Sequence, residues 1–140
     1  ISITSDFIIG YPGESNECFE ETLDLIEQIG FDDGYSFIYS KRPGTPASSE
    51  PDNISISEKK KRLSLVQDLI RTNSEKYLSK LVGTSQEVLI EGMSKTDPMK
   101  LFGRTFTNKM VNFKGPTDLI GQIIDVKIIR SNRNSLDGAL

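Results

Sequence analysis

The first forty residues alternate between short apolar runs and one amphipathic segment. Residues 1–9 end in three large apolar side chains, a run typical of a strand that is buried on both faces. Residues 16–29 carry apolar side chains at spacings of three and four, which predicts a helix. Ser15 is its expected N-cap and Gly30 the expected residue after its end. With a second strand expected at 35–39, the pattern predicts a βαβ unit with parallel strands.

Two loops follow the expected strands at the same edge of the sheet. Ligands of parallel sheets bind where the strands end at their carboxyl side, which here means residues 10–14 and 40–44. Both loops contain proline and glycine, so they bring backbone amides close to a bound molecule. Lys41 and Arg42 add two cations to the second loop.

A longer helix is expected from Ser57, as its N-cap, to about Leu81. Its packed face is predicted to consist of apolar side chains and one amide: Leu63, Val66, Leu69 or Ile70, Asn73, Tyr77 and Leu81. The run from Lys59 to Arg62 consists of four consecutive cations. Such a run is either a solvated helix face or a contact with nucleic acid, and the sequence leaves both open.

The spacing of the apolar residues along the chain changes after Val82. Five short runs rich in β-branched and aromatic residues follow, separated by glycines, at residues 88–91, 101–106, 109–113, 122–130 and 135–140. Short strands at regular spacing predict a small closed or nearly closed β-barrel of OB-like size. The predicted fold class is therefore α/β followed by all-β, with domains at 1–79 and 80–140.

One expected hairpin of this barrel, residues 103–114, interleaves cations, amides and aromatic rings. That composition is typical of a surface that stacks bases and contacts phosphates. We expect its polar side chains to face RNA and Val111 to lie in the core; the RNA-facing set is Arg104, Asn108, Lys109, Asn112 and Lys114. The alternative is an ordinary barrel hairpin with Phe106, Val111 and Phe113 in the core, and both can hold because alternate residues face opposite sides.

Composition narrows the chemistry. The 140 residues are 36% hydrophobic and 26% charged, with no apolar run near the roughly 18 residues of a membrane span and no signal-peptide pattern. The first residue falls inside an expected strand, so we expect a piece of a longer protein. The net charge of −3 is uneven: residues 1–56 carry 11 acids and 2 bases, whereas 57–140 carry 9 acids and 15 bases. A polyanionic partner is thus expected at the later part of the chain.

Metal and thiol chemistry have little support in the sequence. There is no histidine and one cysteine, so no metal or iron–sulfur ligand set is expected within the chain. Cys18 lies in the first turn of the first expected helix, where a thiol is either activated or a small, partly buried filler. No residue is predicted to be catalytic.

Three stretches together resemble one family: residues 5–14 (SDFIIGYPGE), 35–47 (YSFIYSKRPGTPA) and 103–113 (GRTFTNKMVNF). The chain resembles, over nearly its whole length, the C-terminal part of MiaB-type tRNA methylthiotransferases of the radical-SAM methylthiotransferase family. The resemblance implies the C-terminal part of a partial (β/α) radical-SAM barrel followed by a TRAM domain, a small RNA-binding β-barrel. A sister family, which modifies a ribosomal protein, is similar at 7–14 but typically has an acidic residue where this chain has Arg42.

The resemblance also implies an activity for the full-length protein. It would methylthiolate N6-isopentenyladenosine beside the anticodon of tRNA in the cytoplasm. Its cofactors would be S-adenosylmethionine and two 4Fe-4S clusters whose ligands lie outside this chain, and its reductant would be flavodoxin or ferredoxin. This chain by itself would be inactive and would supply cofactor-binding residues at the strand ends: Ile8, Gly10, Ser40 and Arg42. The alternatives are the ribosomal-protein methylthiotransferase and a stand-alone RNA-binding module.

Overall fold

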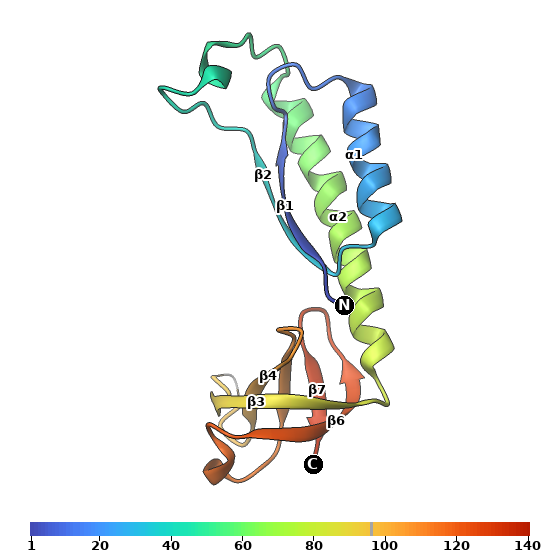
Figure 1. Cartoon of the computed structure of the whole chain (residues 1–140), viewed down its shortest axis with the longest axis vertical. Coiled ribbons are helices and arrows are strands. Elements are labelled where there is room, and N and C mark those ends of the chain that lie inside the picture. Colours follow the sequence, from blue (N-terminus) through green and yellow to red (C-terminus); the bar gives the residue numbers. More distant parts are fainter. Residues whose placement is uncertain (96) are drawn as a thin grey trace. The chain divides into compact units, whose positions relative to one another are not determined.

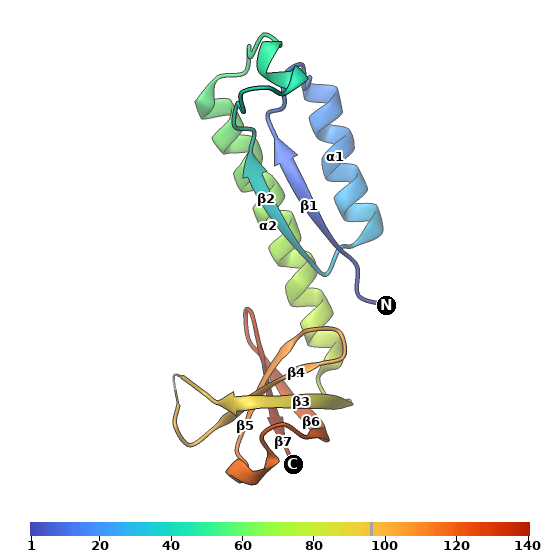
Figure 2. The same ribbon diagram turned by 60° about the vertical axis from the view of Figure 1, so that its left-hand side comes forward.

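A computed structural model describes residues 1–95 and 97–140. The chain divides into two compact units, Ser2–Ser74 and Glu75–Leu140, the second also taking in Ile1. Each unit has its own hydrophobic cluster. Figures 1 and 2 show the helices and strands of the chain. Among the described residues, no helix combines the length and the apolar character needed to cross a membrane.

The first unit contains the predicted βαβ arrangement. Strands β1 (Thr4–Ile9) and β2 (Asp33–Ile38) pair in parallel, with Thr4 opposite Asp33 and Ile9 opposite Ile38. Helix α1 (Asn16–Ile29) has the predicted bounds, because capping residues next to it in the sequence set both of its ends. The Ser15 hydroxyl accepts a hydrogen bond from the backbone N–H of Cys18, and Gly30 takes the left-handed conformation, with φ 66°.

The core of this unit lies on one face of the two strands. It consists of side chains from β1, α1 and α2 together with Phe31: Phe7, Ile9, Phe19, Ile26, Phe31, Val66 and Ile70. The opposite face is bare, and Ile8, Tyr35 and Phe37 are 59%, 71% and 57% exposed there. The expectation that the first strand is buried on both faces is therefore wrong for this structure, since the two helices cover one face only.

Helix α2 spans Ile56–Leu81. Its N-cap is Ser55, whose hydroxyl accepts a hydrogen bond from Glu58 N–H, so the predicted cap at Ser57 is wrong by two residues. Of the four consecutive cations, Lys59 and Arg62 are buried at 4% exposure each, whereas the two between them are exposed. The expectation of a wholly solvated run is thus wrong for two of its four residues.

The second unit is the predicted closed barrel. Its strands are β3 (Ser85–Met93), β4 (Leu101–Thr105), β5 (Met110–Phe113), β6 (Ile123–Ser131) and β7 (Leu136–Ala139), in the order β3-β4-β5-β7-β6. All pairs are antiparallel except β5 with β7. Two short 3₁₀ helices, Pro46–Ser49 in the first unit and Thr117–Leu119 in the barrel, complete the elements. The α/β-then-all-β prediction is confirmed.

The barrel interior is filled by nine buried apolar side chains: Leu78, Val88, Ile90, Leu101, Val111, Phe113, Val126, Ile128 and Leu136. Val111 and Phe113 are therefore core residues, as predicted. Phe106 is not, because it lies in the turn after β4 and is 98% exposed. Asn108 gives that turn its shape with a φ of 62°, and its N–H donates to the carbonyl of Thr105.

Candidate functional site

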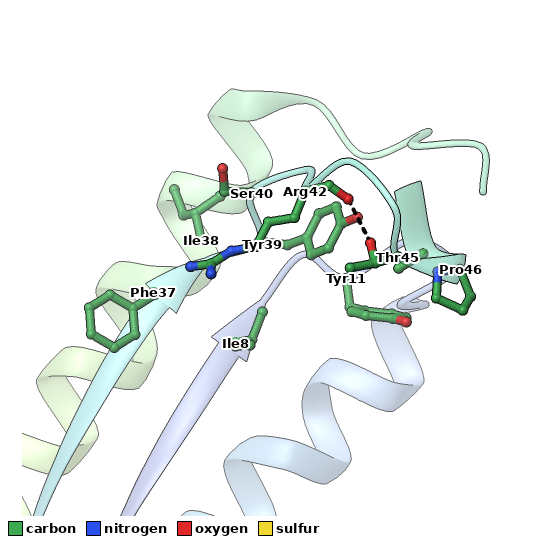
Figure 3. Close-up of a pocket in the computed structure, with 10 residues that line it drawn as sticks. Ile8, Tyr11, Phe37, Ile38, Tyr39, Ser40, Arg42, Thr45 and Pro46 are labelled. Atoms are coloured by element: carbon green, nitrogen blue, oxygen red, sulfur yellow. Dashed lines mark hydrogen bonds between the residues drawn. The ribbon is translucent and has the colours of Figure 1, made fainter. Parts of the chain in front are cut away.

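A pocket of about 400 Å³ lies where β1 and β2 end (Figure 3). It includes three of the four residues predicted to bind a cofactor, Ile8, Ser40 and Arg42. The other lining residues come from the ends of β1 and β2 and from the loops that follow them: Tyr11, Phe37, Ile38, Tyr39, Thr45, Pro46 and Ala47. The two strands are parallel, so their carboxyl ends bring these distant segments together.

Two tyrosines in this pocket were not predicted from the sequence. The rings of Tyr11 and Tyr39 meet edge to face, with centroids 5.3 Å apart. The hydroxyl of Tyr39 is buried and has no hydrogen-bond partner among the described residues. An aromatic residue within two positions of the end of each strand was the signal in the sequence that marked both positions.

The polar side of the pocket belongs to the loop after β2. The Arg42 carbonyl accepts a hydrogen bond of 2.8 Å from the Thr45 hydroxyl, which bends this loop back on itself. Figure 3 shows the Arg42 side chain running back across the strand ends towards Phe37, with Ile8 beneath it. Within the described chain no carboxylate forms an ion pair with Arg42, so its guanidinium is available to an anionic or hydrogen-bond-accepting ligand.

Gly10 lies beside the pocket but is not part of its lining. Its φ is 72°, and a Cβ at this position would lie 2.6 Å from Cγ of Lys59. Glycine is therefore required by the left-handed backbone and by the aliphatic stem of Lys59. This is a different physical reason from the predicted approach of the backbone to a bound molecule.

Two buried cations next to the pocket also escaped prediction. Arg62 forms an ion pair with Glu14, and Lys59 forms one with Asp52, each 2.6 Å long. Burial would lower the pKa of Arg62, but its bonds to Glu14 and Glu58 outweigh that effect and raise it. The hydrogen bond from Lys59 lowers the pKa of Asp52. Arg62 is therefore charged at neutral pH.

Four of the five residues predicted to face RNA line two hollows of the barrel. Arg104 and Asn108 line one hollow, where the Arg104 guanidinium hydrogen-bonds Asn108 and lies 3.4 Å from a carboxylate oxygen of Glu91. Asn112 and Lys114 line another, and this one also contains Lys100, Arg130 and Asp137. Three cations against one carboxylate make this second hollow the more positive of the two.

Lys109 lies in neither hollow. It is 7% exposed, and its ammonium lies 5.2 Å from the centre of the Tyr77 ring. Spacing along the hairpin did not reveal this, because Tyr77 is thirty-two residues earlier in the chain.

The described residues contain no group of three or more His, Cys, Asp or Glu side chains that could hold a metal ion. Cys18 is exposed, so the interpretation of it as a partly buried filler is wrong. A single cysteine does not fit the ligand set of an iron–sulfur cluster.

Known proteins match this chain along its whole length. Residues 79–140 match the TRAM domain family. The chain is 52% identical over 139 residues to the tRNA-2-methylthio-N(6)-dimethylallyladenosine synthase of Buchnera aphidicola subsp. Baizongia pistaciae, covering 99% of this chain and 31% of that protein. The proteins with the same name from Actinobacillus succinogenes and Haemophilus influenzae are 51% and 50% identical over 138 residues, covering 99% of this chain and 29% of each.

The chain thus spans about three tenths of the length of the curated relatives it matches. The matches confirm the resemblance to MiaB-type proteins and the presence of a TRAM domain in the residues that form the barrel. This chain is a homologue of part of the tRNA-2-methylthio-N(6)-dimethylallyladenosine synthases, the MiaB-type tRNA methylthiotransferases, and it ends in a TRAM domain.

Proposed function

We propose that the chain is part of an enzyme that methylthiolates N6-isopentenyladenosine in tRNA. The observation that carries this proposal is the 52% identity, over 99% of the chain, to a protein named as the synthase of that methylthiolated nucleoside. The pocket at the strand ends and the TRAM match fit the two tasks such an enzyme must perform, which are binding a cofactor and binding RNA.

S-Adenosylmethionine is the cofactor that the pocket would hold. Its volume falls within the usual range of small-molecule sites. Ile8, Phe37 and the two tyrosines offer apolar contact to an adenosine, while Ser40, Arg42 and the Tyr39 hydroxyl offer polar groups. When bound, S-adenosylmethionine supplies the radical and methyl-transfer chemistry of the family; the residues of this chain bind and orient it.

The 4Fe-4S clusters belong to other residues of the protein. The one cysteine of this chain does not fit the ligand set of such a cluster. A flavodoxin or ferredoxin would act as reductant, and the reaction would take place in the cytoplasm.

The barrel would bind the tRNA. Its more positive hollow, with Lys100, Lys114 and Arg130, suits phosphates, and Asn112 adds a neutral hydrogen-bonding group. The hollow with Arg104, Asn108 and the exposed ring of Phe106 suits an unpaired base, because its cation is already paired with Glu91.

The test is mass spectrometry of tRNA nucleosides from a strain that lacks the gene. We expect the 2-methylthio group of the modified adenosine to disappear and to return when the full-length gene is restored. Persistence of that group in the deletion strain contradicts the proposal. Measuring the masses of ribosomal proteins from the same strain tests the alternative, in which a ribosomal protein loses the modification instead.

A further inference from the structure

Arg62 fixes the loop that follows β1. One guanidinium nitrogen donates to the Glu14 carboxylate at 2.6 Å and to the Glu14 carbonyl at 3.2 Å, and the other terminal nitrogen donates to the side-chain oxygen of Asn16. The second carboxylate oxygen of Glu14 accepts the N–H of Gly10 at 3.1 Å. Arg62 therefore holds the Glu14 end of the loop directly, and the Glu14 carboxylate in turn holds the Gly10 end. This loop carries Tyr11 into the pocket.

Lys59 connects the same loop to the loop that follows β2. Its stem lies against Gly10, as the 2.6 Å distance from a Cβ placed there to Lys59 Cγ shows. Its ammonium donates to Asp52 at 2.6 Å and lies 5.7 Å from the centre of the Tyr39 ring. Lys59 thus contacts the end of β1, the aromatic wall of the pocket and the far end of the loop after β2.

Neither cation lines the pocket, so neither would contact a molecule bound there. The two cations lie three residues apart at the start of α2, so they lie on the same face of the helix. Lys60 and Lys61, between them, are exposed. Of the four adjacent cations, only Lys59 and Arg62 are buried, and each of these two has a carboxylate partner. Their burial indicates a structural role.

We propose that Lys59 and Arg62 are positioning residues for the cofactor pocket: they hold the two strand-end loops, and with them Tyr11 and Tyr39, in the geometry that binds the ligand. This inference rests on the proposed function, because it takes the ligand to be S-adenosylmethionine. The start of α2 would then contribute to cofactor binding, although its four cations predict a solvated face or a nucleic-acid contact.

The test uses the full-length protein with its clusters in place and S-adenosylhomocysteine as the binding probe. Lys59→Met keeps the stem against Gly10 and removes the charge, and Arg62→Lys keeps the charge and removes the fork of donors. Lys60→Met and Lys61→Met are matched controls on the exposed face. Asp52→Asn breaks the Lys59 ion pair from its exposed partner, at 42% side-chain exposure, and serves as the variant least disruptive to folding.

We expect Lys59→Met and Arg62→Lys to weaken probe binding about ten- to hundredfold, the effect of displacing binding groups by about an ångström. The controls should bind within twofold of the parent protein. Lys59→Met combined with Asp52→Asn should bind no worse than Lys59→Met alone, because both changes break one contact. Each variant's thermal midpoint is measured alongside, so that affinity is compared only between folded proteins.

Unchanged affinity in folded Lys59→Met, Arg62→Lys and Asp52→Asn proteins overturns the inference, even if their thermal midpoints fall, because a purely structural role would lower the midpoint alone. If Lys59→Met and Arg62→Lys do not fold, Asp52→Asn decides: weaker binding supports the inference and unchanged binding overturns it. If the parent protein itself does not bind the probe, the assignment of S-adenosylmethionine to this chain fails, which is a different result.

Discussion

At the scale of single residues, neighbours distant in the sequence decide what a side chain does. Gly10 and Gly13 lie in the same loop, and both have positive φ, 72° and 85°. They differ in surroundings, because a Cβ at Gly10 would meet the stem of Lys59 whereas one at Gly13 would meet nothing within 4 Å. Comparing the same substitution at the two glycines therefore separates the free-energy cost of backbone strain from the cost of crowding against Lys59.

We predict that Gly10→Ala destabilises the protein more than Gly13→Ala. Alanine in the left-handed region costs roughly 1–2 kcal/mol at either position. Crowding against Lys59 adds about 1–3 kcal/mol at Gly10 alone. Urea unfolding followed by far-ultraviolet circular dichroism measures the difference. Equal losses in the two variants would show that Lys59 moves aside without cost.

At the scale of elements, charges on the barrel hold neighbouring strands together. Asp137 in β7 accepts a hydrogen bond of 2.9 Å from Arg130 in β6, and Lys100 Nζ lies 3.9 Å from its other oxygen. Burial alone would raise the pKa of Asp137. The hydrogen bonds from Arg130 and Asn132 and the nearby positive charges outweigh burial and lower that pKa.

A lowered pKa in the folded state means that the charged carboxylate stabilises the barrel above the unfolded-state pKa of about 3.9, and that this contribution is lost as the pH falls through the folded-state pKa. We predict that Asp137→Asn costs about 1–3 kcal/mol at pH 7 and much less near pH 3. Thermal midpoints of the two proteins across this range measure the effect. Asp125→Asn, at an exposed position of β6, should change little at any pH.

A second prediction at the scale of elements concerns the hairpin of β4 and β5 and the hollow lined by Arg104 and Asn108. Replacing Arg104 and Lys109 together by alanine should weaken tRNA binding, because both substitutions remove a positive charge from the hairpin. Lys114→Ala, at an exposed cation, should reduce the slope of log affinity against log salt concentration by about 0.7–0.9.

Filter binding of tRNA to the full-length protein at several salt concentrations checks both effects. Lys127→Ala removes an exposed charge from β6 outside the two hollows and is the control. Unchanged affinity in the Arg104 and Lys109 double variant would remove the hairpin from the RNA-binding surface.

At the scale of the whole molecule, the two units differ in how completely each buries its own surface. The barrel closes on itself and has nine buried apolar residues inside. The α/β unit leaves one face of its two strands uncovered, with the large apolar side chains Ile8, Tyr35 and Phe37 exposed. An uncovered apolar face of this kind is where another part of a protein packs.

We therefore predict that residues 75–140, produced alone, unfold in one cooperative thermal transition, because a closed barrel has no open strand edge and its own core. Residues 1–74, produced alone, should bind a hydrophobic dye such as ANS through the exposed strand face. Calorimetry and dye fluorescence measure these properties. A barrel without a cooperative transition, or an α/β unit that leaves the dye unbound, contradicts the corresponding part.

Elements whose signals are local could be predicted from the amino-acid sequence. Ser15 and Gly30 set the ends of α1, because capping depends on neighbours within a few residues. The glycine-separated β-branched runs predicted the barrel strands, and strand-helix-strand order predicted parallel pairing and hence a ligand site at residues 10–14 and 40–44. These inferences rest on periodicity and chain connectivity, both of which are visible without coordinates.

Which side chains share an environment could not be predicted from the sequence, because it depends on the three-dimensional fold. The run that contains Lys59 and Arg62 predicts either a solvated helix face or a contact with nucleic acid, whereas the fold places Asp52 beside Lys59 and Glu14 beside Arg62. Glu14 is forty-eight residues from Arg62 in the chain. The hairpin pattern predicts that Lys109 faces RNA, and the fold alone shows that its ammonium lies 5.2 Å from the centre of the Tyr77 ring. The physical reason is the same in both cases: burial and ion pairing depend on the space around a side chain, and residues far along the chain fill that space.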